Sequence, residues 1–112
     1  MESDLSIFDD RERAFEQAFI KNEEARFRAL ALRNRMLGEW AAERLALTGD
    51  AFSAYVETVS RSITAEPTDD RLATMIISDL QAHGFPDADK LVRETMVRLL
   101  AEAQKLLGVT KT

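Results

Sequence analysis

Apolar residues recur every three or four positions along most of the chain, and only three short segments interrupt this pattern. These segments are Thr48-Gly49-Asp50, Glu66-Pro67-Thr68 and His83-Gly84-Phe85-Pro86. A spacing of three and four places side chains on one face of an α-helix, and Gly and Pro are common where helices end. The chain has only four Gly and two Pro in 112 residues, so it offers few other places for a helix to stop. The sequence therefore predicts an all-α protein of four helices.

The interruptions set the limits of the four predicted helices. These run from about Asp9 to Leu47, from about Ala51 to Thr64, from the N-cap Thr68 to His83, and from about Asp87 to Leu107. We expect Gly49 to be the C′ residue of the first helix and Asp50 to be the N-cap of the second. Short connections force neighbouring helices to run antiparallel, so the predicted fold is an antiparallel four-helix bundle.

Each predicted helix carries an apolar stripe that should face the core. The stripes are Phe27, Leu30, Leu37, Ala41 and Leu45; Phe52, Tyr55, Val56, Val59 and Ile63; Leu72, Met75, Ile76 and Leu80; and Val92, Met96, Leu99, Ala103 and Leu106. Asn34 also falls on the first stripe, where a buried amide can fix the register of packed helices. Gly38 lies in mid-helix, where Gly costs about 1 kcal/mol relative to Ala, so we expect another helix to approach it closely.

Composition excludes several classes of protein. The net charge of −5 leaves no net basic surface for binding nucleic acid, and there is no Cys for a disulfide or a thiolate metal site. A single His excludes a paired-His metal site, and neither common glycine-rich phosphate-binding pattern is present. The first 25 residues contain no apolar run typical of a signal peptide or a membrane span. We therefore expect a cytoplasmic protein that is not an enzyme, binds no metal and needs no cofactor.

The first predicted helix is too long for the bundle. From Asp9 to Leu47 it would span roughly 58 Å, against roughly 30 Å for the fourth helix. We therefore divide the chain into an N-terminal arm, residues 1–20, and a bundle domain, residues 21–112, with the arm either flexible or projecting. Phe8, Phe15 and Phe19 share one face of an otherwise charged segment, a pattern typical of anchors for a partner protein.

A second candidate site follows from the basic residues of the first helix. Arg33, Asn34 and Arg35 lie together in a stretch that also contains acidic residues. One interpretation is an ordinary solvated helix face with ion pairs along the helix. The other is a nucleotide- or anion-binding site, which would make the chain a helical module with weak nucleotide binding.

Several motifs resemble a known family. Phe8-Asp9-Asp10-Arg11-Glu12-Arg13-Ala14-Phe15-Glu16 is followed by Phe19, Glu23-Glu24, Phe27, Arg33-Asn34, Leu37-Gly38 and Trp40-Ala41-Ala42. Together these motifs are similar to the zeta-subunit family, small bacterial inhibitor proteins of the F1 ATPase. The resemblance is dense from Phe8 to about Leu47, and beyond Leu47 it holds only at the level of the helical pattern.

The resemblance implies a four-helix bundle whose N-terminal arm enters a catalytic interface between the alpha and beta subunits of F1. ATP hydrolysis would be blocked there, and synthesis would be less affected. The protein would be peripheral to the membrane-bound ATP synthase and would not insert into the membrane. Carried over to this chain, the partner-binding positions are Phe8, Arg11, Arg13, Phe15, Glu16 and Phe19. An interaction module with an unrelated partner is the remaining alternative.

Overall fold

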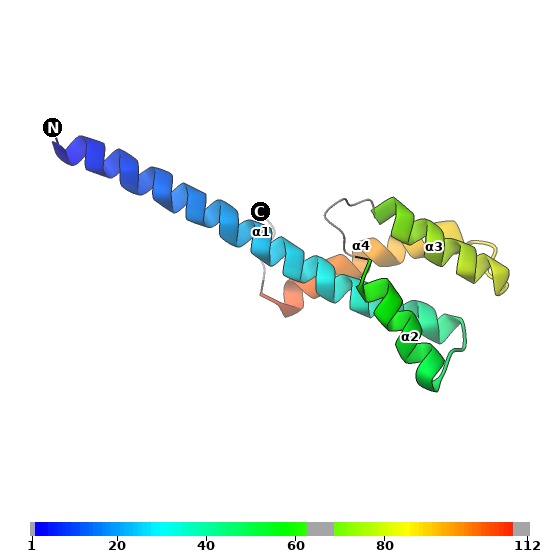
Figure 1. Ribbon diagram of the computed structural model, residues 1–112. Helices are drawn as coiled ribbons and strands as arrows, with labels where there is room; N and C mark the ends of the chain where they lie inside the picture. Colours follow the sequence, from blue (N-terminus) through cyan, green and yellow to red (C-terminus); the bar gives the residue numbers. More distant parts are fainter. Residues whose placement is uncertain (1, 63–68, 109–112) are drawn as a thin grey trace.

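The computed structural model describes residues 2–62 and 69–108, with side chains described for residues 23–62 and 70–108. Within these ranges the chain forms four α-helices and no strand. The helices are α1 (Glu2–Arg44), α2 (Gly49–Ser60), α3 (Asp69–Ala82) and α4 (Ala88–Leu106) (Figure 1). The predicted all-α bundle of four helices is therefore confirmed.

The long helix α1 is the centre of the arrangement. It packs most extensively against α2 and then against α4, while α3 packs mainly on α4 and only touches α1. Helices α2 and α3 have little direct contact. The N-terminal half of α1 continues well past the other helices, and the molecule measures 70 × 27 × 24 Å (Figure 1).

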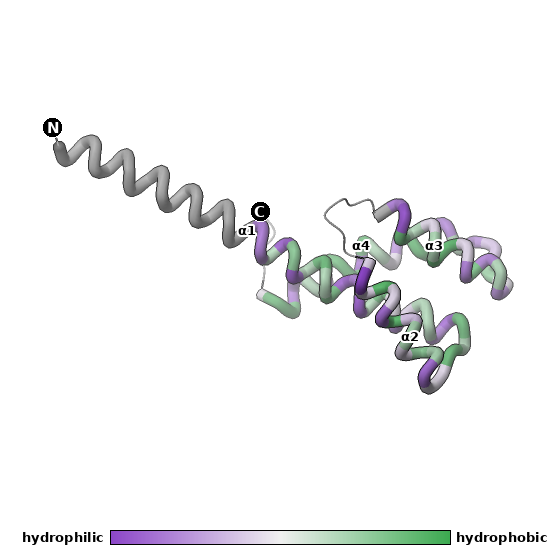
Figure 2. Tube along the Cα trace, in the orientation of Figure 1, coloured by the Kyte–Doolittle hydropathy of each residue, from purple (hydrophilic) through white to green (hydrophobic). Residues whose placement is uncertain are grey.

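The core lies where the four helices converge. Its largest fully buried side chains are Leu37, Val59, Ile76, Leu80 and Val92, so every helix contributes. Hydrophobic and hydrophilic positions alternate along the helices in the manner expected of amphipathic segments (Figure 2). Burying each of these side chains contributes roughly 1.5–3 kcal/mol, which is how a chain without disulfides can hold its fold.

The C-terminus of α1 differs from the prediction. The C′ residue is Ala46, with φ 58°, and not Gly49. The amide of Ala46 donates to the carbonyl oxygen of Glu43 at 3.1 Å and that of Leu47 to Ala42 at 3.0 Å, which together form a Schellman motif. The helix therefore ends at Arg44, three residues before Leu47, because a local backbone motif closes it before the glycine is reached.

The limits of α2 also differ from the prediction. The N-cap of α2 is Thr48, and Asp50, which we expected to cap it, lies in the first turn. Helix α2 ends at Ser60 and not at Thr64, because residues 61 and 62 form a turn. The predicted cap Thr68, and Ile63 at the end of the second stripe, lie outside the described residues.

Two stripe positions expected in the core are exposed, Phe27 on α1 and Leu106 on α4. Near the end of α2, Val59 lies opposite Gly38, and Phe27 is about 16 Å further along α1, so α2 stops before reaching it. Helix α3 has 14 residues against 19 for α4, so the last turn of α4 runs past α3. Both residues lie on the predicted face of their helix, but no other described helix extends far enough to cover them.

Close approach of another helix at Gly38 is confirmed. A Cβ atom placed there would lie 3.0 Å from the Cα of Val56, 3.1 Å from the Cβ of Val59 and 3.3 Å from the carbonyl oxygen of Val56. The missing side chain therefore lets the backbone of α2 pack directly on α1. This contact explains a glycine in a position that is otherwise unfavourable in a helix.

Candidate functional site

The predicted partner-binding residues lie on the part of α1 that projects from the bundle. The backbone there is helical from Glu2 onward. With that backbone, the spacing of Phe8, Phe15 and Phe19 puts their Cβ atoms on one face. The side chains of these three, and those of Arg11, Arg13 and Glu16, lie outside the described residues. Their role as a binding surface and the division at residue 20 stay predictions.

The bundle begins over a short stretch of α1 after the arm. Glu23, Glu24, Arg26 and Arg28 are exposed, and Ala29 is completely buried. Phe27 lies between them with 58% of its surface exposed. Phe27 is thus an exposed aromatic ring at the place where α1 enters the bundle, and a protein bound to the arm could contact it there.

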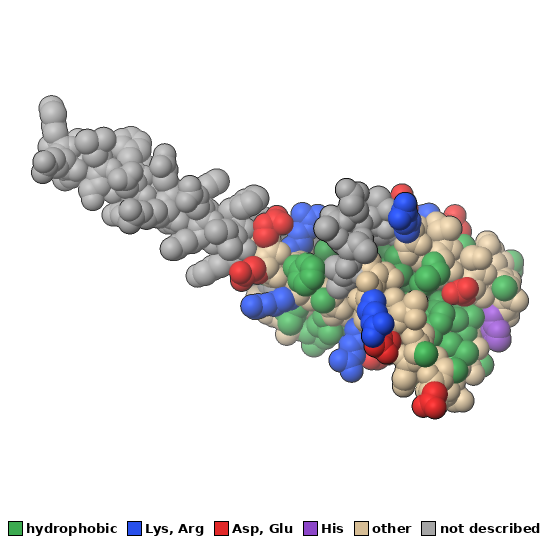
Figure 3. All heavy atoms as spheres, viewed as in Figure 1, with side chains coloured by type: hydrophobic (Ala, Val, Ile, Leu, Met, Phe, Trp, Pro, Cys, Tyr) green, Lys and Arg blue, Asp and Glu red, His purple; other side chains and the backbone are tan. Residues whose placement is uncertain are grey.

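The C-terminal end of α4 lies beside this part of α1. The two helices pack against each other and run in opposite directions (Figure 1). Leu106 and Leu107 at that end are 69% and 43% exposed. We call Phe27, Leu106 and Leu107 the junction patch. Figure 3 shows hydrophobic side chains among charged ones at the end of the bundle from which α1 projects.

The three residues of the predicted nucleotide site do not share one environment. Arg33 and Asn34 are buried, with 3% and 2% of their surfaces exposed, and the Nε of Arg33 donates to the Oδ1 of Asn34 at 2.8 Å. Arg35 lies on the outside of α1, where its Nε is 3.4 Å from the carboxylate of Glu39. The structure thus brings Arg33 and Asn34 together inside the bundle and places Arg35 apart from them.

The burial of Arg33 could not be seen in the sequence. An isolated charged side chain is costly to bury, so arginine on a helix is normally expected at the surface. No buried side-chain nitrogen or oxygen among the described residues lacks a hydrogen-bond partner, so the polar groups inside the bundle are satisfied. The neighbouring Asn34, predicted as a buried amide, supplies one of those partners.

A polar contact joins α2 to α3. The hydroxyl of Tyr55 donates to the Oδ2 of Asp79 at 2.9 Å in a partly buried position. Burial raises the pKa of the Tyr55 phenol, and the hydrogen bond and negative charge of Asp79 raise it further. The phenol therefore stays protonated and acts as a hydrogen-bond donor, not as an acid. Residues 24 positions apart give no local sequence signal for this pair.

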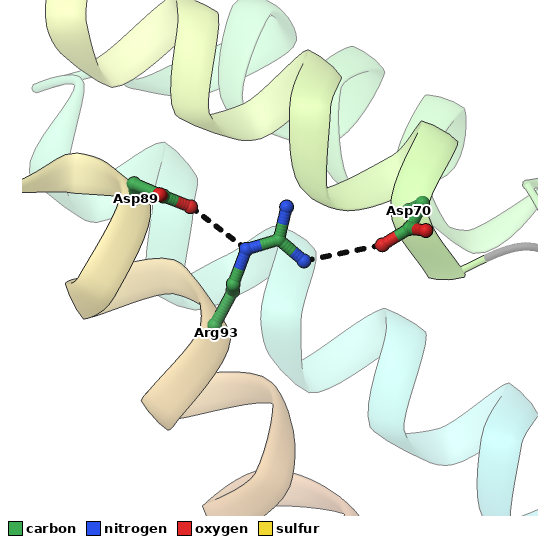
Figure 4. Close-up of polar contacts among 3 residues, drawn as sticks. All are labelled: Asp70, Asp89 and Arg93. Atoms are coloured by element: carbon green, nitrogen blue, oxygen red, sulfur yellow. Dashed lines mark hydrogen bonds and ion pairs between the residues drawn. The ribbon is translucent and has the colours of Figure 1, made fainter.

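An ion-pair cluster joins α3 to α4 on the surface. Arg93 donates from Nε to the Oδ1 of Asp89 at 2.7 Å and from Nη1 to the Oδ1 of Asp70 at 3.2 Å (Figure 4). The hydrogen bond to Asp89 makes the largest contribution to a raised pKa of the Arg93 guanidinium, and the hydrogen bond to Asp70 raises this pKa further. All three side chains are exposed, so the cluster positions the helices and shows no arrangement for catalysis. The spacing of four between Asp89 and Arg93 is a signal for its intrahelical part.

The described residues offer little for other chemistry. Among them, no group of three His, Asp or Glu side chains could hold a metal ion. None of the helices searched over that part of the chain is both long and apolar enough to cross a membrane. What distinguishes the chain is therefore the projecting helix and the exposed apolar residues at its base.

Comparison with known proteins agrees with this description. The model of the family described as ATPase inhibitor subunit zeta matches residues 5–105, which cover nearly all of the projecting part of α1 and of the four-helix bundle. No curated protein and no solved structure matches the chain.

Proposed function

The chain belongs to the family of ATPase inhibitor zeta subunits, and from this premise we propose that it inhibits ATP hydrolysis by inserting its N-terminal arm at a catalytic alpha/beta interface of F1. The family is one of inhibitors, so the role is regulatory and not catalytic. The protein would act in the cytoplasm, bound to the peripheral part of the membrane-bound ATP synthase.

The observation that carries this proposal is the continuity of α1. One helix of 43 residues begins at Glu2 and becomes the central helix of the bundle. The N-terminal half of this helix continues well past the other helices of the bundle (Figure 1). A helix that extends beyond its own core is available to another protein.

A helix that is already formed is also favourable for binding. Fixing the backbone of one residue costs roughly 1–2 kcal/mol of conformational entropy, and a preformed helix avoids that cost on association. The bundle anchors one end of the arm, which favours the helical form because propagating a helix is easier than nucleating one.

The proposed contacts follow from the side-chain chemistry of the arm. Phe8, Phe15 and Phe19 would fill pockets at the interface, as aromatic anchors do in other protein complexes. Arg11 and Arg13 would pair with carboxylates of the partner subunits, since guanidinium groups bind carboxylates through two parallel hydrogen bonds. Glu16 would accept hydrogen bonds from basic groups of the partner.

Deletion of residues 1–19 tests the proposal. The truncated chain should keep its helical circular dichroism and its cooperative unfolding, because the deleted segment belongs to the part of α1 that projects past the other helices. It should no longer inhibit ATP hydrolysis by purified F1 from the same bacterium. Equal inhibition by the intact and truncated chains would show that the arm does not act as proposed.

A point variant with a matched control sharpens the test. Phe15→Ala should raise the concentration needed for half-inhibition by about tenfold or more, the effect of removing one buried anchor. Gln17→Ala is the control, because helical spacing puts Gln17 on the face opposite to Phe15. Both variants leave the bundle untouched, so a difference between them would come from the binding face alone.

The alternative of nucleotide or anion binding at Arg33, Asn34 and Arg35 stays a prediction. Arg33 and Asn34 have only 3% and 2% of their surfaces exposed, so a ligand could reach them only if the surrounding helices moved. Titration with ATP or ADP, followed through the backbone amide resonances of residues 30–38, tests it. If those resonances do not move at millimolar nucleotide, there is no such site.

A further inference from the structure

Exposed large apolar side chains are concentrated at one end of the bundle. Among the described residues there are four of them, and three form the junction patch of Phe27, Leu106 and Leu107. The fourth, Val97, lies on α4 more than two turns before its end and is 73% exposed. Single exposed residues are common on protein surfaces, but a cluster at the base of a binding helix is informative.

No described helix covers the junction patch. Helix α2 ends at Ser60, before it reaches the level of Phe27, and α3 is five residues shorter than α4. The four described helices thus leave the patch exposed at the end where α1 projects.

The surroundings of the patch have the character of an interface rim. Four exposed charged residues flank Phe27 along α1, two acidic and two basic, and Glu102 and Lys105 are exposed just before Leu106. An apolar centre with a charged, solvent-accessible rim is the usual anatomy of a protein–protein interface. The mixture of signs suits a protein surface better than a phosphate-rich or membrane surface, which would require a basic excess.

We propose that the junction patch is a second part of the interface with the ATPase and packs against the rim of the cleft that receives the arm. This inference rests on the proposed function. Its basis is distance along one helix: Phe27 follows the last predicted arm anchor, Phe19, by eight residues, or about 12 Å. A protein large enough to enclose the arm up to Phe19 would therefore meet the end of the bundle, and the surface that it meets is apolar.

The test replaces apolar side chains with glutamine, which is polar and favours helix. The variants are Phe27→Gln, the pair Leu106→Gln and Leu107→Gln, and the control Val97→Gln. Each should unfold at nearly the same denaturant concentration as the unmodified chain, because the replaced side chains are exposed. Inhibition of purified F1 from the same bacterium gives the half-inhibition concentration for each full-length variant.

We expect both patch variants to raise the half-inhibition concentration by about tenfold or more, and Val97→Gln to leave it unchanged. Amide hydrogen exchange in the last turn of α4 should also slow when F1 binds. If the patch variants inhibit like the unmodified chain while deletion of residues 1–19 abolishes inhibition, this inference is wrong and the proposed function stands. If the unmodified chain does not inhibit F1, the proposed function itself fails.

The test also distinguishes binding of the ATPase at the junction patch from binding of a second copy of this chain there. Sedimentation of the unmodified chain would then show a dimer, and the patch variants would be monomers with unchanged inhibition. That result would overturn the proposal in favour of self-association. A monomeric unmodified chain with weakened patch variants supports the ATPase as the occupant.

Discussion

Ala46 ends α1 in a backbone conformation that alanine rarely adopts. Its φ of 58° lies in the left-handed region, where a Cβ atom crowds the following carbonyl group and costs roughly 1–2 kcal/mol. The Schellman hydrogen bonds around it compensate, because they satisfy carbonyl groups at the end of the helix. The strain is thus local, at a residue 27 positions after Phe19, the last predicted anchor of the arm.

This strain leads to a prediction for Ala46→Gly. We expect the free energy of unfolding to rise by about 0.5–1 kcal/mol, since glycine adopts this conformation without the steric cost but loses more entropy on folding. The control is Ala54→Gly at an exposed position within α2, which should lower it by about 1 kcal/mol. Urea unfolding measures both, and a destabilised Ala46→Gly variant would contradict the account.

Gly38→Ala should have the opposite effect to a usual glycine replacement in a helix. Alanine would gain about 1 kcal/mol of helix propensity, but its Cβ would lie 3.0 Å from the Cα of Val56, which is backbone and cannot turn aside. We expect a net loss of about 1–3 kcal/mol, as is typical of overpacked cores. The measurement is again urea unfolding, with Ser53→Ala on the exposed face of α2 as the control. Unchanged stability would mean that α2 moves away at little cost.

For the helices, the spacing of apolar residues predicted the type and number of elements better than it predicted which residues of each stripe are covered by a neighbouring helix. The stripes of α3 and α4 were correct from Leu72 to Ala103, because amphipathic spacing reports which face of a helix is apolar. Spacing does not report how far a neighbouring helix extends, and Phe27 and Leu106 are exposed for that reason. The burial of Arg33 was not predicted, because a charged side chain can be buried only where the folded chain supplies hydrogen-bond partners, and the sequence pattern does not show these partners.

Helices α2 and α3 are linked by a hydrogen bond whose strength depends on pH. Tyr55 is the only tyrosine of the chain, and its pKa is raised in the folded state by burial and by Asp79. An unfolded tyrosine titrates near pH 10, so this contribution to stability is complete below about pH 10 and is lost as the pH rises further.

The expected cost of Tyr55→Phe at neutral pH is about 1 kcal/mol, the usual net value of one hydrogen bond. The difference from the unmodified chain should shrink above about pH 10, where ionisation of Tyr55 stabilises its unfolded state. Unfolding at several pH values measures this, and ultraviolet absorbance follows the phenol directly. An ordinary pKa for Tyr55 in the folded chain would exclude the contact. Asp79→Asn, which keeps an acceptor but removes the charge, should lower that pKa part of the way.

As a whole, the molecule is much longer than a compact domain of its size. The Cα radius of gyration is 19.0 Å, against about 13 Å for a compact chain of 112 residues. We expect small-angle X-ray scattering to give a value near the larger figure. Deletion of residues 1–19 should reduce it to about 12 Å. A value near 13 Å for the intact chain would show that the arm folds back over the bundle.

For the molecule as a whole, the sequence predicted that the first helix is longer than its bundle. It also predicted that the excess lies at the N-terminal end of this helix, because the dense apolar stripe begins only after that end. Phe8, Phe15 and Phe19 were predicted as anchors because charged residues surround them in the sequence, and this role stays a prediction. The junction patch could not be predicted, because it joins residues about 80 positions apart that only the antiparallel packing of α1 and α4 brings to one end.

The unbroken backbone of α1 also fixes the angle between the arm and the bundle. An α-helix turns by about 100° per residue, so each backbone position of the arm has a set angle around the helix axis relative to the bundle. An inserted residue between positions 22 and 29 would turn the whole arm by about 100°, although every anchor would still be present. Under the proposed function, such an insertion should therefore weaken inhibition although no predicted contact residue is lost, because the arm and the bundle belong to one helix.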